Sequence, residues 1–566
     1  MFGLKEFTLV LSRPDDPAIW APYIEPNRKV LVTLSGRIAL DNEEWERAKK
    51  QRGKGGLACK AIYKMYKSGG VDNLENLNGN YVVIIYDPEM KQIHIVTDRC
   101  GMFPCFSSGM VFSSHPDVLA TVLGISHDWD MVSMAEFIMT GKVSFPYSYY
   151  RNIKALDFGS VHTISLDGAN AVYKSKKKYF TFDFKIDHEL TEWDLAEELA
   201  NAFKKAVRKR TLEIFGQSAI SLSGGLDSRT ILCSIREQHG LLAICFFDEK
   251  NIEYKIAEKI ANEANIEFIA LKREPDYYGN SAEEAVRISG GMGWIIGNHY
   301  LGFRDLLKKL EIHNLITGFY CDYFFKGLLL NKKINKFLRT EVFSPFEYEI
   351  EYPYFWFDTS YSNRVKQRLD HSFPESLRND QSEIAKLRIE EKRIFPLFNE
   401  PDNTATLVPQ KVMSWYLPIV DNDIIDIYLK MPPKYKLNTS MYSKMVEVQC
   451  GERFSQIPNC NTGARVNASR ISLFLHRNKK AIERQIKGTI LKSVATDHSW
   501  PNWEYYAHHS EKVRSLWMRK NDVAQEIFAA IMGKDPYQME IQKYRGKGVD
   551  LFFRLLTLKL WLDQRV

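Results

Sequence analysis

An α/β fold built from two unlike sheets is what this sequence predicts, and three observations indicate it. The chain has 566 residues, more than one domain of ordinary size contains. Strands separated by turns fill its first third, whereas helices and strands alternate from about residue 191. Its hydrophobic content of 45% and charged content of 26% are typical of globular proteins and argue against extensive disorder.

The first third of the chain predicts antiparallel strands. Lys29–Leu34 is rich in branched apolar residues, Tyr81–Tyr86 (YVVIIY) predicts a buried strand, and Gln92–Thr97 alternates in polarity. Between the last two lies Asp87–Lys91, where the fixed φ of Pro88 suits a tight turn. We therefore expect a hairpin here.

A charged run marks the expected passage to a second domain. Lys174–Lys178 (KSKKK) and the aromatic Tyr179–Phe184 predict an exposed, solvated crossing. Thr191–Glu213 then predicts a helix, because apolar residues recur at helical spacing after a Thr-x-x-Asp start that resembles a capping box.

The alternating pattern continues beyond this helix. The elements expected in order are a strand at Ser218–Leu222, a helix at about Ser228–Glu237, a strand at Leu241–Phe247, a helix at Ile252–Ala264 and a strand at Glu267–Leu271. This order predicts a parallel, doubly wound sheet that binds ligands past the carboxyl ends of its strands. The last third is expected to be helical and aromatic, with a basic helix in Arg465–Lys492.

Composition excludes several classes of function. Lys and Arg number 77 against 70 Asp and Glu, and the net charge of +7 is too mild over this length to indicate nucleic acid. No window of about 18 uncharged apolar residues predicts a membrane span, and the N-terminal run does not resemble a signal peptide, so we expect a cytoplasmic protein. The eight cysteines form no CxxC pair, which argues against a zinc knuckle or a disulfide framework.

The run Ser218–Thr230 (SAISLSGGLDSRT) is the most informative motif. The glycines of Ser223–Ser228 allow close approach to a phosphate, while helix-start amides and two serine hydroxyls attract anionic oxygens. Asp227 would repel phosphates unless a metal intervenes, so it indicates a Mg²⁺ ion bridging it to a di- or triphosphate. The loop lacks the lysine of GxxxxGK[ST], which argues against kinase-type transfer. A purely structural turn that caps a helix is the alternative.

Ser223–Ser228 resembles the pyrophosphate loop of the asparagine synthetase superfamily (asparagine synthetase B-like), which includes β-lactam synthetases and lasso-peptide cyclases. Further segments resemble the same family in chain order. Leu77–Tyr81 and Thr97–Pro104 are similar to its glutaminase-type domain. Thr317–Gly327 (TGFYCDYFFKG) resembles its second synthetase loop, usually T/S-G-x-G-x-D-E-L-x-x-G, and Leu417–Lys434 with Lys444 resembles the segment that closes the synthetase site.

The resemblance implies an N-terminal Ntn-hydrolase-like β-sandwich flanked by helices and a C-terminal adenine nucleotide α-hydrolase-like parallel sheet with a helical extension. It implies a degenerate class II glutamine amidotransferase-like domain at 1–185, an ATP-pyrophosphatase domain at 186–465 and a helical extension at 466–566. The implied activity is AMP-forming carboxylate activation with ATP and Mg²⁺. A carboxylate attacks the α-phosphate, pyrophosphate leaves, and an amine attacks the acyl-adenylate to form an amide.

Site residues follow from the resemblance position by position. Asp227 and Asp322 would hold the metal, although Asp322 could also be a surface-turn aspartate. The residues implied to line the nucleotide are Ser221, Leu222, Ser223, Gly224, Gly225, Ser228, Phe246 and Gly318, with Leu222 and Phe246 where an adenine pocket is expected. Tyr320 is a candidate catalytic phenol, with a buried structural tyrosine as the alternative.

The N-terminal domain departs from the family. Phe2 stands where the family exposes a nucleophilic cysteine, and the first cysteine of this chain is Cys59. The family's Asn-Gly oxyanion element falls at Ser35-Gly36. We therefore expect no glutamine hydrolysis, a structural role for Asp98, and a domain that serves as a scaffold or docking surface.

The synthetase segments depart as well. Tyr323 replaces the usual acidic residue, and Phe319 stands where Glu or Tyr is common. No lysine occurs in Ile457–Arg465, where the family places a catalytic one, so Arg465 or Lys444 would have to supply the charge. These departures leave the acceptor chemistry open.

Several interpretations remain open from the sequence. An ATP-dependent amide synthetase would use ammonia or a substrate amine, and its variants are a biosynthetic-cluster modifying enzyme, a lasso-peptide macrocyclase and a β-lactam-type ring closer. A catalytically idle nucleotide-binding scaffold and adenylation of another oxyanion are the alternatives. The expected partners are a small-molecule or peptide carboxylate, an amine acceptor and cluster proteins, without nucleic acid; a homodimer is left open. The late aromatics Trp500, Trp503, Tyr505, Tyr506 and Trp517 predict either core packing or a wall of the acceptor pocket.

Overall fold

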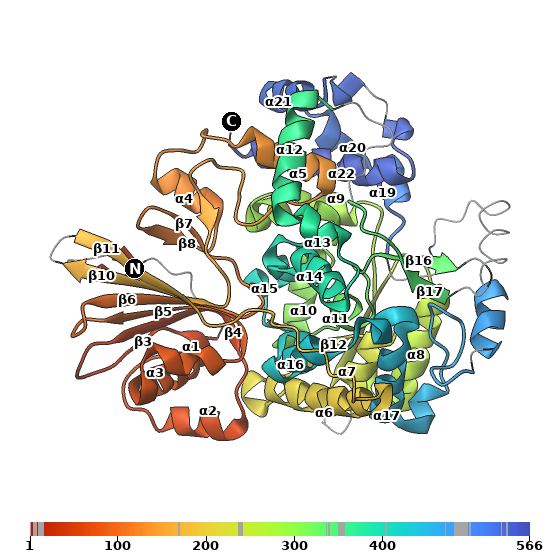
Figure 1. The fold of residues 1–566 in the computed structure, drawn as a ribbon, viewed down its shortest axis with the longest axis horizontal. Helices are drawn as coiled ribbons and strands as arrows, with labels where there is room; N and C mark the ends of the chain where they lie inside the picture. Colours follow the sequence, from red (N-terminus) through yellow and green to blue (C-terminus); the bar gives the residue numbers. More distant parts are fainter. Residues whose placement is uncertain are drawn as a thin grey trace.

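The computed structural model describes residues 2–3, 8–9 and 16–565, except 168–169, 236–240, 336, 338–339, 349–356, 402–403, 470, 480–495, 497–499, 534 and 539–540. Two main sheets, one antiparallel and one parallel, are surrounded by helices (Figure 1). The predicted fold class is confirmed.

The N-terminal domain is built on a six-stranded antiparallel sheet of order β11-β10-β6-β5-β4-β3. Its strands are β3 (Tyr23–Ile24), β4 (Leu31–Ile38), β5 (Gly79–Asp87), β6 (Gln92–Thr97), β10 (Ser160–Asp167) and β11 (Asn170–Lys178). The predicted hairpin is β5–β6, with Val82 opposite Thr97 and Asp87 opposite Gln92.

Both faces of this sheet are covered. One face packs on α1 (Pro17–Trp20), α2 (Asn42–Lys49) and α3 (Leu57–Gly69). Against the other lies a small sheet of β7 (Phe106–Ser108), β8 (Val111–Ser113) and β9 (Lys154–Ala155). A short pair, β1 (Phe2–Gly3) and β2 (Thr8–Leu9), precedes them.

The lysines of Lys174–Lys178 belong to edge strand β11, so the prediction of a linker there was wrong. These side chains are exposed, as predicted, but the backbone is held by pairing with β10. Lysines on an edge strand also oppose pairing with another chain. The crossing to the second domain follows at 179–190, where Phe182 and Phe184 are buried.

The second sheet is wholly parallel, with order β14-β13-β12-β15-β18, as the alternating pattern predicts. Its strands are β12 (Ser218–Ser221), β13 (Leu242–Phe247), β14 (Glu267–Lys272), β15 (Asn314–Ile316) and β18 (Trp415–Tyr416). The helices predicted between strands are α6 (Glu192–Arg210), α7 (Asp227–Ile235) and α8 (Ile252–Ala264). Thr191 and Asp194 form the capping box of α6, and the last two residues of the predicted 228–237 helix lie outside the described residues.

The chain outside the elements named so far is largely helical. This was predicted for its last third, whereas the helices at 116–122 and 131–140 were not predicted. Its helices are α4 (Pro116–Val122), α5 (Met131–Thr140), α9 (Tyr277–Ser289), α10 (Arg304–Lys309), α11 (Cys321–Phe325), α12 (Thr359–Ser372), α13 (Glu375–Asn379), α14 (Glu383–Ile394), α15 (Thr404–Val412), α16 (Asn422–Lys430), α17 (Ser440–Ser455), α19 (Trp503–His509), α20 (Glu511–Met518), α21 (Asp522–Met532) and α22 (Lys547–Asp563). A hairpin of β16 (Lys332–Asn335) and β17 (Thr340–Phe343) lies among them.

The late helices share a second hydrophobic core with α5, α9 and α12, near the top of Figure 1. Of the predicted basic helix in Arg465–Lys492, residues 471–479 are helical, whereas 470 and 480–492 lie outside the described residues.

Each of the eight cysteines is buried and free, as the spacing predicts. Among the helices that the structure describes, none is long and apolar enough to cross a membrane.

Candidate active site

A cavity of about 460 Å³ opens at the carboxyl ends of β12, β13 and β15, the edge where the strand order predicts a ligand. Most of the predicted site residues line it. They are Ser221 at the end of β12, Ser223, Gly225, Asp227 and Ser228 after β12, Phe246 on β13, and Gly318, Tyr320 and Asp322 after β15. The topology therefore brings together segments about a hundred residues apart in the chain.

The loop Ser223–Ser228 folds back on itself. The backbone N–H of Ser223 donates to Ser228 Oγ at 2.9 Å, and the N–H of Gly225 donates to Ser223 Oγ at 3.2 Å. The Ser228 hydroxyl in turn bonds to the Ser223 carbonyl at 3.2 Å. These bonds set the start of α7 against the end of β12.

Two residues of the motif act through their backbone. Leu222 is buried, and its N–H donates to the Ile244 carbonyl at 2.7 Å, which extends the sheet. The Gly224 carbonyl accepts from the N–H of Cys460 at 3.2 Å and ties the loop to a much later segment. Neither residue is among those that line the cavity.

The two predicted metal-binding carboxylates meet at one cation. Lys326 Nζ lies 2.7 Å from Asp227 Oδ1 and 2.7 Å from Asp322 Oδ1. Burial raises the pKa of Asp227 above its ordinary value, with Lys326 opposing it. Burial alone would lower the pKa of Lys326, but the two carboxylates outweigh it and raise that pKa, so the ammonium stays charged.

Close packing fixes the approach of these two loops. A Cβ atom at Gly318 would lie only 2.7 Å from Asp227 Cβ, so glycine is needed there.

Tyr320, which precedes α11, has φ of +67°. It is 4% exposed, and its hydroxyl bonds with Thr406 Oγ1 at 3.1 Å, in agreement with the structural alternative for this residue.

Several residues of the site escaped the sequence analysis, and Arg229 and Lys326 are the two that hold its segments together. Buried Arg229 donates to the carbonyls of Phe454, Ile457 and Pro458 at 3.2, 2.7 and 2.9 Å. It thereby holds the later segment against α7, where Cys460 and Asn461 join the cavity wall. Lys326 is the other. Its position four residues after Asp322 in a short helix was the available sign of an ion pair.

The basic residues considered for catalysis lie elsewhere. Lys444 on α17 forms an ion pair with Glu192 at the start of α6, and Arg465 is exposed. Neither lines the cavity. Lys326 is the lysine found beside the predicted metal-binding pair.

The far wall of the cavity is aromatic. The Trp500 ring lies 6.4 Å from that of Phe319 and 5.1 Å from that of His299, centroid to centroid. Burial lowers the pKa of His299 to about 3, with Arg273 adding to the effect, so this imidazole is neutral at neutral pH. Of the late aromatics, Trp500 lines the cavity, whereas Trp517 is buried in the second core, as the core-packing alternative predicts.

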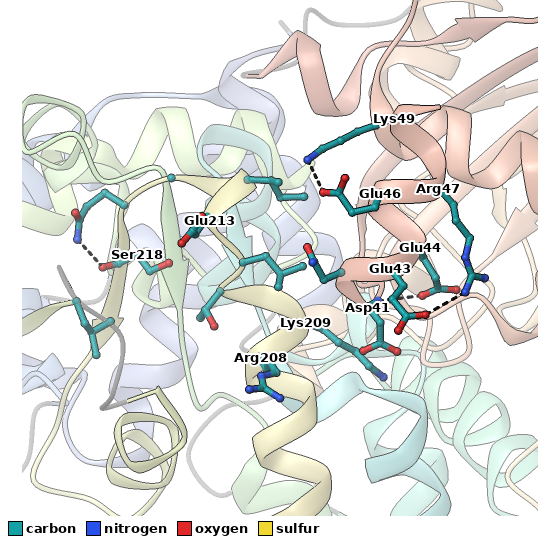
Figure 2. Close-up of a pocket in the computed structure, with 17 residues that line it drawn as sticks. Asp41, Glu43, Glu44, Glu46, Arg47, Lys49, Arg208, Lys209, Glu213 and Ser218 are labelled. Carbon is teal, nitrogen blue, oxygen red and sulfur yellow. Dashed lines mark hydrogen bonds and ion pairs between the residues drawn. The ribbon is translucent and has the colours of Figure 1, made fainter. Parts of the chain in front are cut away.

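A larger cavity, about 1410 Å³, lies at the opposite end of β12. Figure 2 shows the acidic residues of α2 facing Arg208 and Lys209 of α6 across it. Pairs within α2 neutralise part of this charge, with Arg47 Nη2 at 3.1 Å from Glu43 and Lys49 Nζ at 2.6 Å from Glu46. No predicted site residue lines it, so the smaller cavity is the candidate site.

Two separate parts of the chain match known protein families. Residues 22–180 match the family model described as glutamine amidotransferase domain, and residues 198–297 match the one described as asparagine synthase. A putative asparagine synthetase [glutamine-hydrolyzing] of Mycobacterium tuberculosis is 23% identical over 259 residues, 44% of this chain and 39% of that protein. A second such protein, of Methanocaldococcus jannaschii, is 27% identical over 193 residues, 32% of this chain and 36% of its own length.

The match therefore spans less than two fifths of the length of these relatives. Among solved structures, an NH3-dependent NAD synthetase from Campylobacter jejuni matches 39% of this chain and 93% of its own at 13% identity. Its TM-score of 0.18 is too low to support an argument. On the sequence matches, the chain carries a glutamine amidotransferase domain followed by an asparagine synthase domain and is distantly homologous to putative asparagine synthetases.

Proposed function

We propose that this protein is an ATP-dependent, AMP-forming amide synthetase that activates a substrate carboxylate and transfers it to ammonia or a substrate amine. One observation carries the proposal: Asp227 and Asp322, from loops after two different parallel strands, meet at the mouth of a cavity beside the SGGLDS loop. Paired carboxylates beside a phosphate-type loop suit a magnesium-bound diphosphate.

The donor set fits the ion that the proposal requires. Two carboxylates within reach of one cation provide the hard oxygen ligands that Mg²⁺ prefers, and Asp227 and Asp322 would hold it. When bound, the ion would neutralise charge on the phosphates. The rest of the proposed chemistry falls to the chain, whose loop hydroxyls and amides bind phosphate oxygens and whose aromatic wall excludes water from the reacting carboxylate.

The proposed reaction proceeds in two displacements. An oxygen of the substrate carboxylate bonds to the α-phosphorus of ATP, and the bond to the β-phosphate oxygen breaks, with its electron pair leaving on pyrophosphate. The amine nitrogen then attacks the acyl carbon, AMP leaves with its electron pair, and the nitrogen loses a proton. Phe319 and Tyr323 on the acceptor side favour a substrate other than aspartate, because neither side chain can balance an ammonium group.

We also propose that the N-terminal domain does not hydrolyse glutamine. Ser35-Gly36 lies within strand β4, where the family has Asn-Gly. The Asp98 carboxylate is 1% exposed and accepts backbone N–H groups of Tyr81, Cys100, Met102 and Phe103 at 2.9–3.3 Å. A carboxylate satisfied in this way supports a structural role, and the domain would then serve as a scaffold.

The test is nucleotide consumption with a panel of carboxylates and amines. The wild type should release pyrophosphate and AMP in equal amounts, and Asp227→Asn should lower the rate by about 100-fold or more. The matched control is Asp305→Asn on α10, whose side chain is 81% exposed and which should leave the rate unchanged. Release of ADP and phosphate would contradict the proposal, and ATP binding without turnover across the panel would favour the idle scaffold. Glutamate released from glutamine would contradict the loss of the glutaminase.

A further inference from the structure

Lys326 occupies the centre of the candidate site, although nothing in the loop motifs assigns it a role. Its ammonium contacts both oxygens of Asp227, at 2.7 and 2.8 Å, and one oxygen of Asp322 at 2.7 Å. The side chain is 11% exposed and lines the cavity. The Tyr442 ring centroid lies 5.0 Å from Nζ and gives the ammonium a further favourable neighbour.

The cluster of these three groups carries a net charge of −1, which would repel a phosphate chain. Without the metal, a cation that can turn toward the phosphates would offset this repulsion. Of the described residues that line the cavity, Lys326 is the sole lysine. Arg273, also in the lining, is committed to Asp248 at 2.7 Å and to the Tyr278 hydroxyl at 3.0 Å.

The partners of Lys326 differ in how firmly they hold it. The Asp322 side chain is 57% exposed, whereas that of Asp227 is 21% exposed. An ion pair open to water contributes little free energy, so Lys326 can exchange Asp322 for another anion at small cost. Because its stem is flexible and its charge compact, lysine is well suited to move between a carboxylate and a phosphate oxygen.

We propose that Lys326 binds the phosphate chain of the nucleotide directly and exchanges Asp322 for oxygens of the leaving diphosphate. This inference rests on the proposed function, for which Lys326 supplies the lysine that Ile457–Arg465 lacks. Lys326 would donate hydrogen bonds to the departing pyrophosphate and transfer no proton. Asp322 would be released to serve as a ligand of the metal.

The alternative is that Lys326 only neutralises two facing carboxylates. Binding of inorganic pyrophosphate to the full chain, measured by titration calorimetry in the presence of EDTA, separates the two roles without requiring turnover. Lys326→Gln should weaken binding by about 10- to 100-fold, the effect of losing one charge-assisted contact. Lys326→Arg should restore most of the affinity.

A charge-matched variant removes the ambiguity of the single substitution. The double variant Asp322→Asn/Lys326→Gln keeps the net charge of −1, so it also guards against misfolding caused by an unopposed carboxylate pair. If Lys326 contacts the phosphates, the double variant should bind pyrophosphate as weakly as Lys326→Gln. Recovery of affinity to within about twofold of the wild type would overturn the proposal, as would a wild type that does not bind pyrophosphate.

The outcomes are distinguishable from failure of the proposed function. Pyrophosphate binding that depends on Lys326, without AMP formation by the wild type, would support the phosphate contact and contradict the synthetase. AMP formation together with affinity recovered in the double variant would support the synthetase and refute the phosphate contact.

Discussion

Gly318→Ala tests whether the two loops of the candidate site lie as close as the structure shows. The new Cβ would lie 2.7 Å from Asp227 Cβ and 3.2 Å from the Asp227 carbonyl carbon. Carbon atoms at van der Waals contact are about 3.5–4.0 Å apart, so one loop must retreat by about 1 Å. Because the clash involves the backbone of Asp227, rotation of a side chain cannot relieve it.

The size of the effect follows from this displacement. Overpacking of this kind typically costs about 1–3 kcal/mol of unfolding free energy, which urea denaturation followed by tryptophan fluorescence would measure. Because Asp227 is the residue displaced, a shift of about 1 Å should lower the rate of pyrophosphate release by about 100-fold.

A matched glycine provides the control. At Gly69, the last residue of α3, the three atoms nearest to a Cβ would be side-chain atoms of Asn73, at 3.1–3.4 Å. Gly69→Ala should therefore change stability by less than about 1 kcal/mol and leave activity unchanged. Wild-type stability and activity in Gly318→Ala would refute the loop contact. Lowered stability with unchanged activity would refute the importance of Asp227's position.

Three further substitutions test other parts of the structure. Asp421→Ala should lower the unfolding free energy, measured in urea, by about 3–5 kcal/mol, because it removes the carboxylate that lies 2.6 Å from buried Arg210. A loss below about 1 kcal/mol would show that this ion pair is not formed. Between pH 6 and 4, the unfolding free energy should fall less steeply in His299→Asn than in the wild type, by up to about 1.4 kcal/mol per pH unit. The reason is that histidine in the unfolded chain takes up a proton near pH 6.5, whereas folded His299 does so only near pH 3. An unchanged slope in pH-dependent denaturation would show that His299 titrates normally. Tyr320→Phe should lose the bond from its hydroxyl to Thr406 and keep AMP formation within about threefold. A 100-fold loss would establish a catalytic phenol.

Much of the fold was predictable because local and tertiary preferences agree. The helix expected at Ile252–Ala264 is observed with those bounds, since the side chain of Asn251 accepts from the N–H of Tyr254 and caps it. The lysine-rich part of β11 was not predictable as a strand. Its sequence shows no apolar alternation, and it is a strand because it pairs with β10, which no local pattern reveals.

The same distinction separates the predicted from the missed site residues. Asp227 and Asp322 sit in motifs whose spacing is local, so the sequence indicated both. Lys326 gained its role because two loops meet in space, which depends on the order of β12 and β15 in the sheet. Lys444 lies on the face of α17 that meets α6, and its pairing with Glu192 could not be read from the spacing of charges along one helix.

Tyr320 adopts a backbone conformation that glycine adopts more readily than tyrosine. The related loops carry glycine at this position, and here the backbone still has φ of +67°, a region in which a tyrosine costs about 1 kcal/mol or more. Burial of the ring, which is 4% exposed and 5.3 Å from the Tyr323 ring, offsets that cost. Tyr323 itself replaces an acidic residue and donates its hydroxyl to Glu400 at 2.8 Å. The altered residues thus support one another, while Asp322 stays in place to meet Asp227 through Lys326.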